Sequence, residues 1–211
     1  MKYTTKKWTT EENALSTKTV LAIALILCAF SVHAHSELGV AGGLMSGFLH
    51  PIYGFDHLLA MVAVGLWGAQ LGKPAIWVLP ITFPLVMAVG GLIGMAVIDI
   101  PFVEFGISLS ALALGAAVAF CWRPHIAFAA VVVAIFAIYH GHAHGTELPS
   151  AVNPLAYGVG FVISTGLMHL VGIVLGLMTR WPKGQKLLRG LGAVIAASGL
   201  FFLASTVGLL V

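Results

Sequence analysis

Six apolar segments, each long enough to cross a membrane as a helix, follow one another along the chain. They comprise residues 51–72, 75–97, 103–122, 125–147, 152–179 and 187–210. A helix needs about 20 apolar residues to span the roughly 30 Å of hydrocarbon in a bilayer. Charged residues make up only 8% of the 211-residue sequence, whereas soluble domains carry about 25%. The chain is therefore predicted to be all-α, an integral membrane bundle of six transmembrane helices, which excludes a soluble enzyme and a nucleic-acid-binding domain.

Residues 1–34 are expected to form a cleaved signal peptide. An apolar run at 20–30 follows a polar start and is too short to cross the membrane as a helix. The sequence that ends at Ala34 resembles the small-residue cleavage box of a secretory signal. Cleavage there makes His35 the first residue of a mature transmembrane domain at 35–211. The alternative is an uncleaved first helix that continues past His35.

The basic residues in the loops orient the bundle. Beyond the N-terminal segment they are Lys73, Arg123, Arg180, Lys183, Lys186 and Arg189. All of them fall in the first, third and fifth loops, and cytoplasmic loops are the ones enriched in Lys and Arg. The mature N-terminus and the C-terminus are therefore expected on the periplasmic side of the bacterial inner membrane. Segment 38–49 is too short to span and is expected to lie at this outer surface or dip into it.

Tryptophans and glycines mark further features of the spans. The tryptophans near the predicted cytoplasmic ends are Trp67, Trp77, Trp122 and Trp181. They are interpreted as interface anchors. Glycine pairs at a spacing of four are Gly68 with Gly72, Gly90 with Gly94, and Gly172 with Gly176. They are interpreted as surfaces where helices pack closely.

Two clusters of ionisable residues interrupt the apolar sequence. The first is His50, Asp56 and His57, and the second is His140, His142, His144 and Glu147. An ionisable side chain inside a span costs at least about 2.5–3.5 kcal/mol on insertion scales, so it marks a candidate functional site. The alternative is that these histidines and acids pair with one another and stabilise the bundle.

Counting residues places the two clusters at the same depth. If Pro51 begins the first span, Asp56 and His57 lie about 8–9 Å below the outer surface, at 1.5 Å per residue. The fourth span runs the opposite way, which places His144 and His140 roughly 5 and 10 Å deep on the same side. Ligand-type residues from two remote segments are therefore predicted to converge.

The spacing in the fourth span favours a metal site. On a helix, His140, His144 and Glu147 fall within an arc of about 60°, whereas His142 points to the far side. Two histidines at this spacing can bind one divalent ion. With the ligands of the first span, the site offers nitrogen and oxygen but no thiolate, which suits Ni, Co or Zn and disfavours Cu(I).

Other polar or soft residues in the spans are less informative. His169, deep in the fifth span, is either an inner relay ligand or a satisfied core histidine. Met61, one turn below His57, is interpreted as packing rather than as a ligand. His125, beside Arg123, is interpreted as an interfacial residue.

The segments 50–72 and 139–149 together resemble the HupE/UreJ family of bacterial membrane proteins. That family has a His-x5-Asp-His element in its first helix and a His-Gly-x-Ala-His-Gly-x-Glu element in its fourth. The matching residues here are His50, Asp56, His57, His140, His144 and Glu147. The resemblance extends over the mature chain, including a histidine near its N-terminus, His35. Tyr139 stands where many members have Phe, a difference expected to affect only packing.

The resemblance implies a secondary permease for nickel or cobalt, of the kind that often serves hydrogenase, urease or cobalamin synthesis. Capture at His35 and His50 would precede transfer to the remaining ligands of the two elements. No prosthetic group is expected, since the metal ion that binds is the transported Ni²⁺ or Co²⁺. The sequence does not determine whether the protein forms a homo-oligomer. The sequence has no GxxxxGK[ST] motif for nucleotide binding, which excludes pumping by this chain's own ATP hydrolysis.

Two other functions use the same residues. A membrane-embedded zinc hydrolase would activate water on a bound ion, but the sequence has no HExxH helix, and Ser46 lacks the context of a serine nucleophile. A metal-storing or accessory protein would bind the ion without transporting it. The chain is expected not to be an enzyme.

Overall fold

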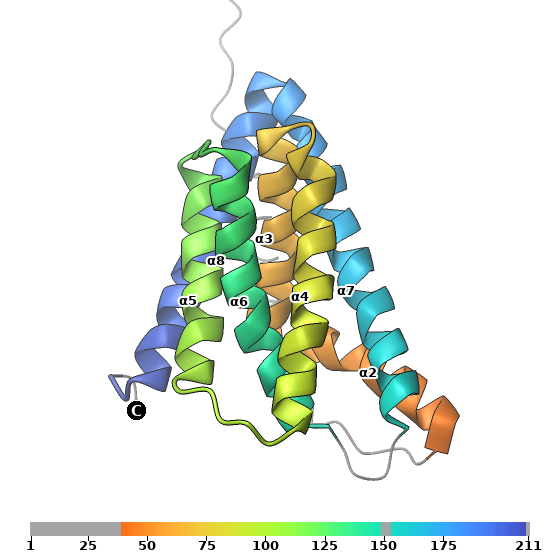
Figure 1. The fold of residues 1–211 in the computed structure, drawn as a ribbon. Helices are drawn as coiled ribbons and strands as arrows, with labels where there is room; N and C mark the ends of the chain where they lie inside the picture. The colour runs from red at the N-terminus through yellow and green to blue at the C-terminus, as the bar shows by residue number, and fades with distance from the viewer. Residues whose placement is uncertain (1–38, 149–152, 210–211) are drawn as a thin grey trace, which may run out of the picture. The chain divides into compact units, whose positions relative to one another are not determined.

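The computed structural model describes residues 39–148 and 153–209, which form helices joined by short connections (Figure 1). The helices are α2 (Gly39–Tyr53), α3 (Phe55–Leu71), α4 (Ala75–Met95), α5 (Val103–Ala119), α6 (Ile126–Thr146), α7 (Pro154–Gly176) and α8 (Pro182–Thr206). A 3₁₀ turn, η1 (Leu177–Arg180), joins the last two. The described part is thus all-α, as predicted. The predicted signal peptide and His35 lie outside the described residues.

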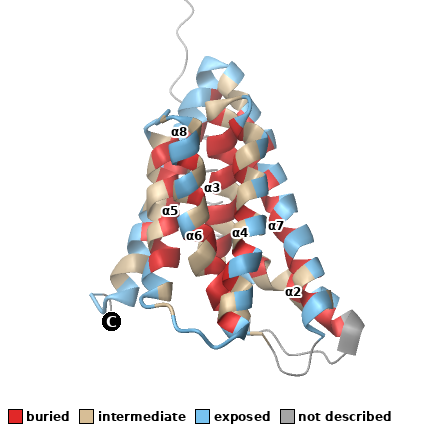
Figure 2. Ribbon diagram, in the orientation of Figure 1, coloured by how far each residue is buried: buried red, intermediate tan, exposed pale blue. Residues whose placement is uncertain are grey.

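Helix α3 is the centre of the bundle. It contacts α4, α5, α7 and α8, and residues on all its faces are buried, among them Ala60, Val64 and Trp67. Figure 2 shows burial along the length of α3, whereas α4, α7 and α8 carry exposed residues on their outer faces. Many of those exposed residues are large and apolar, such as Leu85 and Val174. An apolar outer surface of this kind suits contact with lipid.

Within residues 39–148 and 153–209, four helices are long and apolar enough to cross a membrane: α4, α6, α7 with η1, and α8. A fifth candidate is the pair formed by α2 and α3, if it counts as one bent span. Helix α5 is apolar but has only 17 residues. The structure therefore supports a multi-pass membrane protein with four to five candidate spans, a coarser result than the six expected.

The first span does not begin where the sequence suggested. Pro51 lies inside α2, and α3 begins only at Phe55, after the extended residue Gly54. The two helices are bent by 81°. The expectation that Pro51 starts the helix is therefore wrong, and Asp56 lies in the first turn of α3 instead of five residues into it. A proline is best suited to the first turn of a helix, but here it lies in the last turn of α2, where its missing N–H leaves one backbone hydrogen bond of that helix unmade.

Glycines bring α6 very close to α4, which fixes the face that α6 turns inward. A Cβ at Gly141 would overlap the Met87 carbonyl, and one at Gly145 would overlap the Gly91 carbonyl. The predicted packing role is confirmed for the α4 pair at 90 and 94, which meets α6 backbone in the same way. It is wrong for Gly72, which has φ +80° and ends α3 with no neighbour against it.

Trp67 is not an interface anchor. Its side chain is fully buried, stacks on Trp122 with ring centroids 5.9 Å apart, and donates its Nε1–H to the Trp122 carbonyl at 2.9 Å. Trp77, Trp122 and Trp181 are exposed, as the interpretation requires. The position of a tryptophan near the end of a span is the same for Trp67 as for the other three. What distinguishes Trp67 is that it lies on the central helix, and the sequence alone does not show which helix is central.

The basic residues gather at one end of the bundle, although Arg180 lies in η1 and Lys183, Lys186 and Arg189 lie in the N-terminal part of α8, so most of the predicted fifth loop is helical. The α3–α4, α5–α6 and α7–α8 connections lie together at the top in Figure 1, and the α4–α5 connection and the end of α8 lie at the opposite end. The predicted grouping of the basic loops on one side is therefore confirmed.

Candidate metal centre

Three helices bring the two ionisable clusters together. His50 lies in the last turn of α2, Asp56 and His57 in the first turn of α3, and His140 and His144 in the last two turns of α6. The bend at Gly54 turns the end of α2 across the start of α3. The predicted convergence of the two clusters is confirmed, although it depends on a bend that the sequence analysis did not include.

The outermost group consists of His50, His144 and Glu147. Each offers one ligand atom, and these atoms all lie within 4.8 Å of one another. The His50 Nε2 is 3.4 Å from the Glu147 Oε2, and their side chains are 32% and 52% exposed. Glu147 is the C-cap residue of α6. His50 and Glu147 are thus accessible to water whereas His144 is buried, so this group forms the mouth of the centre.

The imidazole rings continue inward as a file, which we define as His50, His144, His57 and His140. Successive ring centroids are 4.8, 4.4 and 4.6 Å apart. His50 at the outer end is partly exposed, His144 and His57 are buried, and the His140 side chain is completely buried. The file therefore leads from the hydrated mouth into the dry interior.

The backbone and Asp56 leave ligand nitrogens free on the two inner rings. His57 donates from Nδ1 to the Asp56 Oδ1 at 2.9 Å, and its backbone N–H donates to the same oxygen at 2.8 Å. His140 donates from Nδ1 to the Phe136 carbonyl at 3.0 Å. The Nε2 atoms of both rings are buried with no hydrogen-bond partner among the described residues, and the same holds for both ring nitrogens of His144. A histidine whose other nitrogen is held by a carboxylate or carbonyl is the usual arrangement of a metal ligand.

His142 points away from this file. Its Nε2 lies 2.9 Å from the Ile98 carbonyl, in the connection that follows α4. The helical-face argument is therefore confirmed for the geometry of α6. His142 ties the α4–α5 connection to α6 and contributes no ring to the file.

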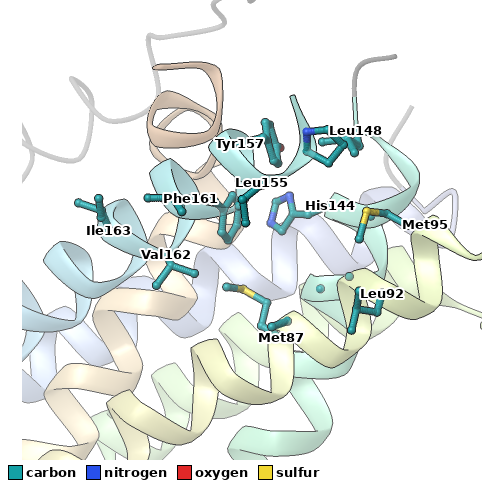
Figure 3. A pocket seen from close by; sticks show the side chains of 17 residues that line it. Met87, Leu92, Met95, His144, Leu148, Leu155, Tyr157, Phe161, Val162 and Ile163 are labelled. Atoms are coloured by element: carbon teal, nitrogen blue, oxygen red, sulfur yellow. The ribbon is translucent and has the colours of Figure 1, made fainter. Parts of the chain in front are cut away.

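Aromatic side chains enclose the rings. Phe161 lies with its ring centroid 4.1 Å from that of His144, Tyr157 is 5.9 Å from His50, and Phe83 is 5.3 Å from His140. Figure 3 shows the His144 ring among the apolar side chains of a cavity of about 640 Å³ between α4, α6 and α7. The lining is almost entirely apolar; apart from His144, its polar side chain is Tyr157, whose hydroxyl has no hydrogen-bond partner among the described residues.

The chain is similar in sequence to known proteins. The family model described as HupE / UreJ protein matches residues 23–202. Protein HupE of Rhizobium leguminosarum bv. viciae is 43% identical over 183 residues, which cover 87% of this chain and 94% of that protein. No solved structure gives a significant match.

The chain belongs to the HupE/UreJ family.

Both elements on which the resemblance was based lie in this HupE/UreJ chain around one centre. The sequence analysis missed the aromatic residues Phe83, Tyr157 and Phe161, which contact the rings. Nothing in an apolar span distinguishes such an aromatic from one that faces lipid. It also missed Thr165, which is buried in α7. Its hydroxyl in an apolar span was a usable signal, because a buried polar group needs a partner.

Proposed function

We propose that this HupE/UreJ protein is a secondary permease that takes up Ni²⁺ or Co²⁺ across the bacterial inner membrane through the histidine file. The observation that carries the proposal is a continuous file of four imidazoles, three of which have buried nitrogens without a hydrogen-bond partner among the described residues, in helices apolar enough to span a membrane. Neutral imidazole is a good ligand for these borderline ions. A set of histidines that served only to stabilise the bundle would be hydrogen-bonded to one another.

The gradient of burial supports a stepwise path. His50 and Glu147, which are partly exposed, receive the ion with part of its water shell, and His35 would assist them from the mature N-terminus. His144, then His57 and His140, replace the remaining water with nitrogen ligands. Since neighbouring rings are less than 5 Å apart, the ion can exchange one ligand at a time and is never without one.

Asp56 acts through His57 in this proposal. The carboxylate holds the Nδ1–H, so the Nε2 lone pair faces the file, and its negative charge makes the imidazole a stronger ligand. It also offsets part of the charge of the ion in a region where hydration is lost.

The membrane potential supplies the driving force. Moving a divalent ion inward across 100 mV is worth about 4.6 kcal/mol, twice the value for one elementary charge. The proposed topology has six spans, with α3 as the first and the short helix α5 as the third. The basic connections face the cytoplasm by the positive-inside rule, and the mature N-terminus and the C-terminus face the periplasm. This arrangement places the mouth on the periplasmic side.

The test is uptake of radiolabelled Ni²⁺ and Co²⁺ into proteoliposomes that contain the purified protein, with an imposed inside-negative potential and Zn²⁺ as competitor. We expect uptake that exceeds the amount of protein many times over and rises with the potential. Zn²⁺ competition would rank the metals.

The same assay separates the other functions. A storage or accessory protein would retain one or a few ions per chain, independent of potential, and this result would refute the permease. A zinc hydrolase would show no uptake of either ion.

A further inference from the structure

A second set of unpartnered polar atoms lies deeper in the bundle, on α7. His169 and Thr165 are buried, with at most 1% of their surface exposed. Both ring nitrogens of His169 and the Thr165 hydroxyl have no hydrogen-bond partner among the described residues. A threonine in a helix commonly donates to a carbonyl of the preceding turn, and Thr165 does not. Buried polar groups in a membrane helix are normally satisfied within the protein, so this pair needs another explanation.

The pair shares one face of α7 and one position in the bundle. Four residues apart on a helix, Thr165 and His169 are separated by about 40° around the axis, whereas Ser164 lies about 140° from His169. Gly65 of α3 packs directly on the His169 carbonyl, which fixes this turn of α7 against the central helix.

The position continues the histidine file inward. Phe161 contacts His144, and His169 follows eight residues later, about 12 Å further along α7. The ring of Phe83, on α4, makes edge contacts with both His140 and His169, at centroid distances of 5.3 and 5.5 Å. One aromatic side chain thus joins the innermost ring of the file to the next histidine.

Helix α4 adds a backbone oxygen at the same place. The Phe83 ring contacts His169, and Pro80 lies one turn earlier on α4, so its carbonyl is near the His169 ring although no hydrogen bond joins them. Pro84, four residues later, has no N–H to donate to that carbonyl. The proline pair of α4 therefore presents an oxygen that the helix itself does not use.

We propose that His169 and Thr165, with the Pro80 carbonyl, form an inner transfer site for the divalent ion. The ion leaves His140, passes the edge of Phe83 and binds the His169 imidazole before release toward the basic end of the bundle. Nitrogen and oxygen ligands of this kind match the preference of Ni²⁺ and Co²⁺. The inner site rests on the proposed function, because it extends the same path.

The first experiment separates uptake from binding at the mouth. His169→Gln and Thr165→Val are compared with Ser164→Ala, which removes an equally buried, unpartnered hydroxyl from another face of α7. We expect His169→Gln to lower proteoliposome uptake of Ni²⁺ at least tenfold and Thr165→Val several-fold, with the affinity for the first bound Ni²⁺ unchanged within twofold. Ser164→Ala should resemble wild type. Wild-type uptake by both α7 variants, or loss of the first bound Ni²⁺ in His169→Gln, would overturn the proposal.

The second experiment needs no transport. In a His57→Gln/His144→Gln background, purified protein is titrated with Co²⁺ and followed by its visible absorption. We expect residual binding that is lost when His169→Gln is added and kept when Ser164→Ala is added. An inner site would be contradicted if the double variant bound no Co²⁺, or if its remaining Co²⁺ binding were unchanged when His169→Gln was added. Absence of uptake by wild-type protein would refute the proposed function alone, because the Co²⁺ titration examines the inner ligands separately.

Discussion

Replacing Asp56 by Asn removes one charge from the centre and little else. The carboxylate Oδ1 accepts from both the backbone N–H and the Nδ1–H of His57, at 2.8 and 2.9 Å. An asparagine oxygen can accept the same two hydrogen bonds in the same geometry. The variant therefore keeps the orientation of the ring and changes only its electrostatics.

The expected loss follows from the strength of these bonds. A hydrogen bond to a charged group contributes about 1.5–3 kcal/mol, and one between neutral groups about 0.5–1.5 kcal/mol. The difference, about 1–1.5 kcal/mol, corresponds to roughly a five- to tenfold weaker interaction. The lost attraction between Asp56 and a divalent ion adds to this. We therefore expect Asp56→Asn to lower Ni²⁺ uptake at least tenfold.

The stability of the fold should fall only modestly, since the weaker hydrogen bonding costs about 1–1.5 kcal/mol. Asp56 lies in the first turn of α3, where a negative charge is worth about 0.3–1 kcal/mol. Native proteins are typically stable by about 5–15 kcal/mol. The amount of protein in the membrane and its melting temperature in detergent should thus stay near wild type.

The assay is initial-rate uptake into proteoliposomes at equal protein content. Asp99→Asn is the matched control, since it makes the same chemical change at an exposed position in the α4–α5 connection. It should transport normally. Wild-type uptake by Asp56→Asn would remove Asp56 from the path and refute the proposed charge support of His57.

Two further outcomes are expected. A reporter that is active only outside the cytoplasm should work when fused after Val211 and fail when fused at Lys183; the reverse pattern would overturn the topology. His142→Ala should keep most uptake, whereas His140→Ala and His144→Ala should each abolish it, because His142 bonds the Ile98 carbonyl outside the file. Equal losses in all three variants, measured by the same uptake assay, would contradict the separation of faces on α6.

Much of the centre could be predicted because helix geometry is regular. The rise of 1.5 Å and the turn of 100° per residue were enough to predict that His57 lies near His140. They also predicted that His142 lies on a different face of the helix from His140 and His144. The bend at Gly54 was not predictable in this way. A glycine after a proline is compatible with a continuous helix, a kink or a break, and packing of α2 on α7 selects the break.

The order of the helices in space could not be predicted from hydropathy. Lipid tails are as apolar as a protein core, so the central helix α3 and the peripheral helix α4 both consist mostly of apolar residues. For that reason Trp67 was assigned to an interface and Phe83 was not noticed. The hydroxyl of Thr165, by contrast, is unusual both against lipid and in an apolar core. It therefore marks a position whose role the inner-site experiments can examine.

The close approach of α4 and α6 leads to a last prediction, which concerns a residue with no ligand atom. A Cβ at Gly141 would overlap the Met87 carbonyl and crowd the Gly91 backbone. Backbone cannot move aside as a flexible side chain can, so Gly141→Ala must push α6 away from α4. Overpacking of this kind costs about 1–3 kcal/mol.

Gly166→Ala is the control, because its Cβ would meet nothing within 4 Å. Both changes gain the same helix propensity, up to about 1 kcal/mol, so the difference between the two variants isolates the cost of the contact. We expect Gly141→Ala to melt at a lower temperature than Gly166→Ala in detergent. It should also lower uptake, since His140 and His144 move with α6 relative to His57. Equal melting temperatures and equal uptake would show that the α4–α6 contact does not hold the file in place.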